Sequence, residues 1–436
     1  MTNPLKAVMD IKREEWPLAL LMFSYFFLVI TSFWILKPIK KTLFIGYYKD
    51  AGFDLLGWHL SASQAELIAK VLNMAVAFIA VAVFTWLTRR FRRQQLTFIF
   101  SGFFIFCYVL YSRIIGVPGD LTVWSFYLFG DLFSTLMVAT FFAFVNDSVT
   151  PSKAKRMYGL IGLGGVTGGA FGSLVVRVWI DQVGMASWLW IALGLAALII
   201  VIAFLAGKLV EKNPPPETRA DESTPGVKKS SAAIEGAKLV FSSSYLLAIV
   251  GIVGLYEIVS TVMDFQFTAT IEHFVARENL GHHFSTIYTI TNFTAMFVQL
   301  FLTSFIMTRL SVKTALYVLP VIMLVASGFY MAIPILWVGT FLNTADNGFS
   351  YSINQSAKET LYVPTSRDEK YKAKAFIDMF VNRFAKAIAV GVSLLITTIF
   401  ADFSSIRWLS LFTIVIIIIW LYAVRYAGNR FKEMAG

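Results

Sequence analysis

The sequence predicts an all-α membrane protein with twelve transmembrane helices arranged as two six-helix bundles. Hydrophobic residues make up 57% of the chain and aromatic residues 16%, values above those of ordinary soluble domains. Apolar segments of about 20 residues, long enough to cross a hydrocarbon layer of ~30 Å as helices, recur from Trp16 to Tyr426. A polar segment near the middle of the chain separates six of them from the other six.

The polar segment and the apolar ones define the predicted organisation. The segment Glu211–Gly236 is rich in Pro, Ser and charge, a composition that cannot bury a core, so we expect a linker. The predicted domains are an N-terminal bundle (1–208), a cytoplasmic linker (209–244) and a C-terminal bundle (245–436). The predicted spans are 16–36, 62–87, 95–115, 122–146, 156–180, 185–208, 245–267, 284–308, 312–333, 335–357, 373–400 and 404–426.

Basic residues orient the predicted spans. Arg89–Arg93 joins the second and third spans, Lys153–Arg156 joins the fourth and fifth, and Arg430 follows the last. Because cytoplasmic loops retain Lys and Arg, we expect both termini in the cytoplasm. The same rule accounts for the net charge of +11, so we expect no nucleic-acid partner. The single cysteine, Cys107, excludes an intrachain disulfide.

The two halves of the chain repeat short motifs. "TRRFRR" begins at Thr88 and "TRLSVK" at Thr308, 220 residues apart. "KAK" occurs at Lys153 and again at Lys372, 219 residues apart. Parallel six-span repeats are typical of the major facilitator architecture, which has a substrate site between the halves near the membrane midplane. We therefore expect this architecture.

Ionisable residues inside the predicted spans indicate a polar pathway. Each costs at least ~2.5–3.5 kcal/mol in lipid, so it normally faces a cavity, pairs or lines a route. Glu66 and Lys70, one turn apart, are expected to neutralise each other. The full set is Glu66, Lys70, Asp131, Arg177, Glu257, Asp264, Asp346, Asp378, Arg383 and Lys386.

Three lysines follow the first span at its outward end, against the positive-inside trend. Lys37 and Lys41 share a helix face, with Lys40 adjacent, if the helix continues past Pro38. Two interpretations stay open. Either the lysines contact an anionic substrate, or their long stems carry the amines to the membrane interface.

The second half contains a second cationic pair. Arg383 and Lys386 are three residues apart on one helix face, and Asp378 lies too far along the helix to neutralise both. They predict a cationic wall for a ligand with several negative charges, such as phosphates. Glu257 and Asp264, seven residues apart, share a face of the seventh span. They serve either as counter-charges to the cations or as carriers of a coupling proton.

Two further motifs have simpler interpretations. Glycines at four-residue intervals in Tyr158–Ser173 predict close helix packing rather than a nucleotide fingerprint, which needs a strand and a soluble fold. The histidine-containing segment Glu272–His283 lacks fixed metal-ligand spacing, so a solvated outward loop is favoured over a metal site. We expect no metal and no cofactor.

The segment "KETLYVPTSRDEKYKAKAFID", followed by "VNRFAK", resembles the ATP/ADP translocases of plastids and obligate intracellular bacteria. That family reads Lys-Glu-x-x-Tyr-x-Pro, then Lys-x-Lys-x-x-Ile-Asp and Asn-x-x-x-Lys. "ILKPIKKTL" and "SKAKRMYGLIGLG" are similar to two more family motifs, but Pro38 and Lys41 replace aspartates, and Ser152 and Lys153 replace an acidic pair. The matching residues are Lys358, Glu359, Tyr362, Pro364, Lys372, Lys374, Ile377, Asp378, Asn382 and Lys386.

The resemblance implies transport of nucleotides, often ATP exchanged for ADP, by alternating access. The alternative is a major facilitator transporter of another organic anion or a lysophospholipid, because a site with fewer carboxylates is more purely anion-seeking. A membrane enzyme is not expected, since no nucleophile with its base is recognisable. We expect a monomer that binds a small anionic substrate in a lipid bilayer. The predicted substrate-binding residues are Lys37, Lys40, Lys41, Glu257, Asp264, Arg383 and Lys386, and the predicted gating residues are Lys155, Lys358, Glu359, Lys374 and Asp378.

Overall fold

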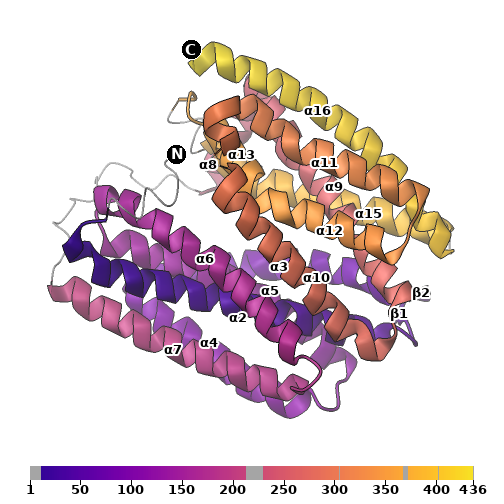
Figure 1. Cartoon of the computed structure of the whole chain (residues 1–436), viewed down its shortest axis with the longest axis horizontal. Coiled ribbons are helices and arrows are strands. Elements are labelled where there is room, and N and C mark those ends of the chain that lie inside the picture. Colours follow the sequence, from indigo (N-terminus) through magenta and orange to yellow (C-terminus); the bar gives the residue numbers. More distant parts are fainter. Residues whose placement is uncertain (1–10, 213–228, 304, 367–371, 401, 436) are drawn as a thin grey trace. The chain divides into compact units, whose positions relative to one another are not determined.

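Almost all described residues of the computed structural model lie in helices (Figure 1). The structure describes residues 11–212, 229–303, 305–366, 372–400 and 402–435. The α-helices are α2 (Trp16–Tyr48), α3 (Ala62–Thr88), α4 (Arg93–Ile114), α5 (Asp120–Ser148), α6 (Pro151–Trp179), α7 (Met185–Lys212), α8 (Lys229–Ser242), α9 (Ser244–Phe274), α10 (Leu280–Phe297), α11 (Val312–Ala332), α12 (Leu336–Phe349), α13 (Gln355–Leu361), α14 (Lys374–Phe376), α15 (Asn382–Ile399) and α16 (Trp408–Ala435).

Ten helical segments of the described residues are long and apolar enough to cross a membrane, which confirms the all-α membrane class. The predicted spans 284–308 and 335–357 are not among the ten, because π-helical turns divide them. The helix α10 is followed by η3 (Val298–Thr303) and η4 (Ile306–Leu310), and α12 is followed by η5 (Ser350–Asn354) and α13. Another π-helix, η7 (Ile377–Val381), precedes α15. Such turns are frequent at functional sites.

A short β-hairpin that the sequence did not predict joins α2 to α3. The strands β1 (Phe53–Leu55) and β2 (Trp58–Leu60) are antiparallel, with Phe53 opposite Leu60. Leu56 and Gly57 form the turn between them and have φ angles of 51° and 86°. Two consecutive positive φ angles suit the twist of a two-residue hairpin. Leucine rarely adopts this conformation, so the sequence carried no clear turn signal.

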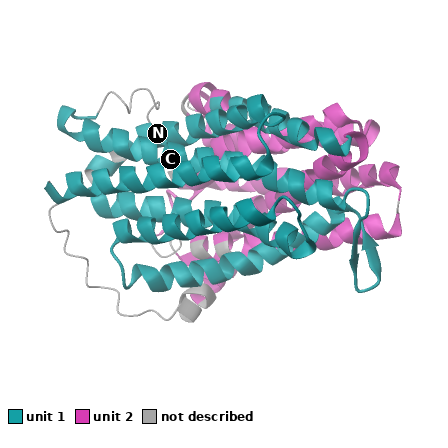
Figure 2. Cartoon of the chain, turned by 90° about the horizontal axis from the view of Figure 1, so that it is seen from below, with its two compact units in different colours: residues 1–220, 276–296 teal, residues 221–275, 297–436 magenta. Residues whose placement is uncertain are grey.

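The chain divides into two compact units (Figure 2). Unit 1 comprises residues 1–220 and 276–296, and unit 2 comprises residues 221–275 and 297–436. Unit 1 therefore includes most of α10, although α10 follows α9 of unit 2 in the sequence. The predicted linker over 209–244 contains the helix α8, and its residues 213–228 lie outside the described part of the chain.

In unit 1, α6 packs directly on the backbone of α2. A Cβ atom on Gly164, Gly168 or Gly172 would lie 2.7, 2.5 or 2.6 Å from a backbone oxygen of α2. The Thr31 hydroxyl of α2 donates a hydrogen bond to the Gly168 carbonyl oxygen at 3.2 Å. Only glycine permits this approach, so the predicted close packing of the glycine run is confirmed.

The contact between α2 and α6 keeps one register along its length. Gly168 faces Phe27, 141 residues earlier in the chain, and the other two glycines face residues of α2 at the same separation. Arg156 and Glu15 are also 141 residues apart and form an ion pair near the start of the two helices. The two helices are therefore parallel.

In unit 2, α9 packs against α12, α15 and α16, and α11 packs against α12 and α16. The Gln266 side-chain amide of α9 donates to the Ile406 carbonyl oxygen at 3.1 Å and to the Ser410 hydroxyl at 2.9 Å. These buried bonds fix α9 against the start of α16. The polar residues of α9 that the sequence singled out are thereby held in a defined orientation.

Replacing Gly168 by Ala is expected to lower stability, because the new Cβ would lie 2.5 Å from the Phe27 carbonyl oxygen, and overpacking costs about 1–3 kcal/mol. The matched control is Gly162→Ala in the same helix, where nothing lies within 4 Å of the Cβ position. Melting temperatures of the two variants in detergent provide the test. Equal melting temperatures would contradict the close packing.

Candidate functional site

The helix α2 continues through Pro38 to Tyr48, so the condition for a shared lysine face is met. Pro38 has no backbone N–H, which leaves the preceding turn without one helical hydrogen bond. Lys40 and Lys41 are buried, with side-chain exposures of 6% and 5%. They do not reach toward solvent, so interfacial snorkelling does not describe these two side chains.

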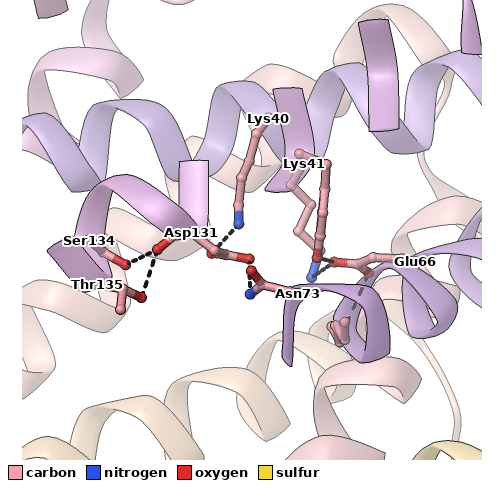
Figure 3. A network of polar contacts seen from close by, with 9 residues as sticks. Lys40, Lys41, Glu66, Asn73, Asp131, Ser134 and Thr135 are labelled. Carbon is pink, nitrogen blue, oxygen red and sulfur yellow. Dashed lines mark hydrogen bonds and ion pairs between the residues drawn. The ribbon is translucent and has the colours of Figure 1, made fainter. Parts of the chain in front are cut away.

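Lys40 forms an ion pair with Asp131 of α5 (Figure 3). The second carboxylate oxygen of Asp131 accepts a hydrogen bond from the Asn73 amide of α3 at 2.9 Å. The Lys40 Nζ also lies 4.4 Å from the ring centroid of Tyr127. A Cβ atom on Gly130 would come within 2.6 Å of the Lys40 Cδ, so a glycine is needed where the lysine stem passes α5.

Lys41 pairs with Glu66 of α3, with 3.2 Å between Nζ and Oε1 (Figure 3). Glu66 also accepts a hydrogen bond from the Tyr127 hydroxyl at 2.7 Å. The predicted contact between Glu66 and Lys70 is present at 4.0 Å, but Lys41 is the nearer cation. Tyr127 thus touches both ion pairs and links them.

Lys37 lies among aromatic rings. Its Nζ is 4.4 Å from the ring centroid of Trp34, 4.9 Å from that of Tyr288 and 5.8 Å from that of Phe33. Tyr288 belongs to α10, within the part of that helix assigned to unit 1. Ring faces attract a cation, so these three rings help to hold the Lys37 amine in place.

We define Lys37, Lys40, Lys41 and Lys70 as the lysine cluster of unit 1. Three of these amines share two carboxylates, since Lys40 pairs with Asp131 while Lys41 and Lys70 both lie within 4.0 Å of Glu66. Buried ion pairs contribute little net stability, because desolvation offsets the attraction. Stability alone therefore does not account for the cluster, and its amines are chemically suited to contact an anion.

Unit 2 contains a second set of charged residues. The Lys386 Nζ of α15 lies 3.0 Å from the Glu257 Oε1 of α9. The Lys386 side chain is 46% exposed, in contrast to the buried lysines of α2. Arg383 and Asp264 are half-buried on the same two helices. The contact agrees with the counter-charge interpretation of Glu257.

The predicted gating residues are only partly brought together. Lys374 and Glu359 form an ion pair at 2.5 Å, and the Gln355 amide donates to the same Glu359 carboxylate at 3.1 Å. Lys358 is half-buried on α13, and Asp378 is exposed on η7. The side chain of Lys155 lies outside the described part of the structure.

The histidine-containing segment is mostly helical and not a loop. Glu272 and His273 belong to α9, whereas His282 and His283 belong to α10. The His282 Nδ1 lies 2.8 Å from an Asp181 carboxylate oxygen, and the His273 ring stacks on Phe403 with centroids 4.0 Å apart. No group of three or more potential metal ligands occurs among the described residues.

Replacing Asp131 by Asn is expected to destabilise unit 1, because Lys40 would remain buried without its carboxylate. Breaking a buried pair in this way costs about 3–5 kcal/mol, whereas removing both charges is often nearly neutral. The double variant Lys40→Met, Asp131→Leu should therefore melt at a higher temperature than Asp131→Asn alone. Asp54→Asn, at a side chain that is 80% exposed, is the matched control. A melting temperature of Asp131→Asn equal to that of the control would exclude the buried pair.

Family models match two overlapping parts of the chain. Residues 18–362 match the Major Facilitator Superfamily, and residues 328–431 match the TLC ATP/ADP transporter family. The second range contains the charged segment that resembles the translocases, so that resemblance is confirmed. Sequence reasoning found this segment but missed Asn73 and Tyr127, for which the helix pattern gives no signal.

Relatives and solved structures agree with these matches. The plastidic ATP/ADP-transporter of Solanum tuberosum is 22% identical over 94% of this chain and 72% of its own length. The ADP,ATP carrier protein 1 of Rickettsia bellii is 20% identical over 98% of this chain and 96% of its own length. The structure of the nucleoside transporter NupG superposes with a TM-score of 0.64 at 12% identity, covering 93% of this chain and 99% of that one. Because the first family model matches most of the chain, the protein belongs to the Major Facilitator Superfamily.

Proposed function

We propose that this protein is a membrane transporter that exchanges nucleotides of the ATP and ADP type by alternating access. The observation that carries the proposal is the lysine cluster of unit 1, in which two buried lysines of α2, Lys40 and Lys41, lie inside a multi-pass membrane protein. A nucleotide has several negative charges on its phosphates, and such a ligand complements a cluster of lysine amines. The names of the relatives supply the cargo class.

In this proposal the carboxylates hold the lysines while no cargo is bound. Glu66 and Asp131 hold the Lys41 and Lys40 amines in a fixed orientation. An arriving phosphate then replaces the carboxylates as partner, so the amines are never left buried without an anion. Arg383 and Lys386 stay proposed as further cargo contacts, with Glu257 and Asp264 as their counter-charges.

The ion pair between Lys374 and Glu359 is proposed as a latch that opens and closes during the cycle. Charge pairs of this kind bias rocking states, because each state makes or breaks them. Lys155, Lys358 and Asp378 stay proposed members of the same gate. The protein is further proposed to act as a monomer in a bacterial inner membrane, with both termini in the cytoplasm, and to catalyse no chemical reaction.

A different organic anion or a lysophospholipid is the second candidate cargo. The pairing of Lys41, which replaces a family aspartate, with Glu66 favours it, because one more cation makes the site less specific for one nucleotide. A thermal-shift panel distinguishes the two candidates, since only true ligands stabilise the folded state at saturating concentration. Stabilisation by a lysolipid or sugar phosphate, and by no nucleotide, would favour the second cargo.

Replacing Lys40 and Lys386 together by Ala is expected to abolish nucleotide uptake into proteoliposomes. A hydrogen bond to a charged group is worth about 1.5–3 kcal/mol, so each single variant should lose roughly tenfold or more in apparent affinity. The matched control is Lys208→Ala, an exposed lysine on α7. Uptake by the double variant equal to that by the control, at equal protein abundance, would refute the assignment.

Exchange is expected to require nucleotide on both sides of the membrane. Liposomes loaded with internal nucleotide should take up labelled nucleotide, and empty liposomes should not. In an exchanger the binding site changes from inward-facing to outward-facing only while an anion is bound to its cations. Counterflow should persist when a protonophore collapses the proton gradient. Accumulation that depends on the gradient and ignores internal nucleotide would instead indicate symport.

A further inference from the structure

Asp346 of α12 is a buried carboxylate with no part in the proposed cargo contacts. It is 4% exposed. Its Oδ2 accepts a hydrogen bond from the Ser260 hydroxyl at 2.5 Å, and its Oδ1 accepts one from the Tyr256 hydroxyl at 3.2 Å. Within the described ranges, no lysine, arginine or histidine lies within 4.0 Å of this carboxylate. The other buried carboxylates of the candidate site differ, since each has a lysine partner.

The charged groups that face Asp346 from α9 are both acidic. Glu257 and Asp264 act on it as like charges. Glu257 in turn pairs with Lys386 of α15, with 3.0 Å between Oε1 and Nζ. The environment on this side therefore opposes a negative charge on Asp346.

The other helix packed on α12 is α11, and it supplies no counter-charge among the described residues. Its ionisable residues are Lys313, Tyr317 and Tyr330. The Lys313 amine donates to the Asn429 side chain at 2.7 Å, and the Tyr330 hydroxyl shares a hydrogen bond with Thr270 at 2.6 Å. A buried, negatively charged carboxylate without a nearby cation has a high desolvation free energy, and binding a proton removes that charge.

The hydrogen-bond partners of Asp346 suit both of its protonation states. A hydroxyl group donates to a carboxylate and accepts from a carboxylic acid, whereas a lysine amine can only donate. Ser260 and Tyr256 can therefore stay in place while the proton comes and goes. The position is also next to an irregular backbone, because η5 begins four residues later and the Ser350 N–H bonds to the Asp346 carbonyl oxygen. Irregular helical turns of this kind recur at functional sites.

We infer that Asp346 binds and releases one proton as the transporter changes state, without making nucleotide exchange dependent on a proton gradient. Its carboxylate takes a proton from water in one state and returns it to water in another, and no other bond changes. The inference rests on the proposed transport function. It assigns the proton to Asp346, and leaves Glu257 and Asp264 as counter-charges of the cations.

The test compares ADP-for-ADP exchange in proteoliposomes with equal pH on both sides, from about pH 5 to about pH 8. The wild type and the exposed control Asp54→Asn should vary with pH along the same curve. Asp346→Asn imitates the protonated carboxyl group and cannot titrate. The pH dependence of its exchange rate should therefore be weaker than that of the wild type and should reflect only the titration of ADP. Infrared difference spectra of the purified proteins over the same range should contain one titrating carboxyl band that Asp346→Asn lacks.

A pH profile and an infrared band that Asp346→Asn shares with the wild type would overturn the inference. If no protein exchanges nucleotide, the proposed function fails, and the infrared band alone still decides whether Asp346 titrates. If Asp346→Asn does not fold, Ser260→Ala replaces it. Loss of one hydroxyl partner should shift the midpoint of the pH profile, and an unchanged midpoint would also overturn the inference.

Discussion

The ion pairs that hold the α2 lysines inside unit 1 are the constraint around which that unit is arranged. A buried amine without a counter-charge is too costly to keep, so α3 and α5 must each place a carboxylate beside α2. Tyr127 can then bond Glu66 and face the Lys40 amine at once. The absence of a side chain at Gly130 makes room for the lysine stem. The ion pairs, the aromatic contact and the missing side chain at Gly130 therefore all serve to accommodate the α2 lysines.

The sequence allowed good prediction of what one helix shows by itself. Composition predicted the membrane class, the spacing of the glycines predicted close packing, and the lysines of α2 stood out because they contradict the charge rule for loops. The partners of these lysines could not be predicted. Asp131 lies 91 residues from Lys40 in the chain, and helical periodicity identifies a shared face but not the helix that covers it. The aromatic contact of Lys37 with Tyr288 of α10 was hidden for the same reason.

The two units treat their buried charges differently. In unit 1 the buried carboxylates meet cations, Glu66 and Asp131 a lysine each and Glu15 an arginine. In unit 2 Glu257 meets a half-exposed lysine, while Asp346 meets only hydroxyl groups. An amine fixes the charge state of its partner, whereas a hydroxyl group tolerates either state. The kind of partner therefore separates a site suited to binding an anion from a site suited to a change of protonation.

The constant register between α2 and α6 has a mechanical consequence. Where two backbones touch without an intervening layer of side chains, neither helix can advance past the other without separating all of the contacts. The ion pair between Glu15 and Arg156 closes the same register at the start of both helices. The two helices are therefore expected to move as one rigid body. A displacement of the first turn of α6 would therefore also displace the segment of α2 that carries the lysines.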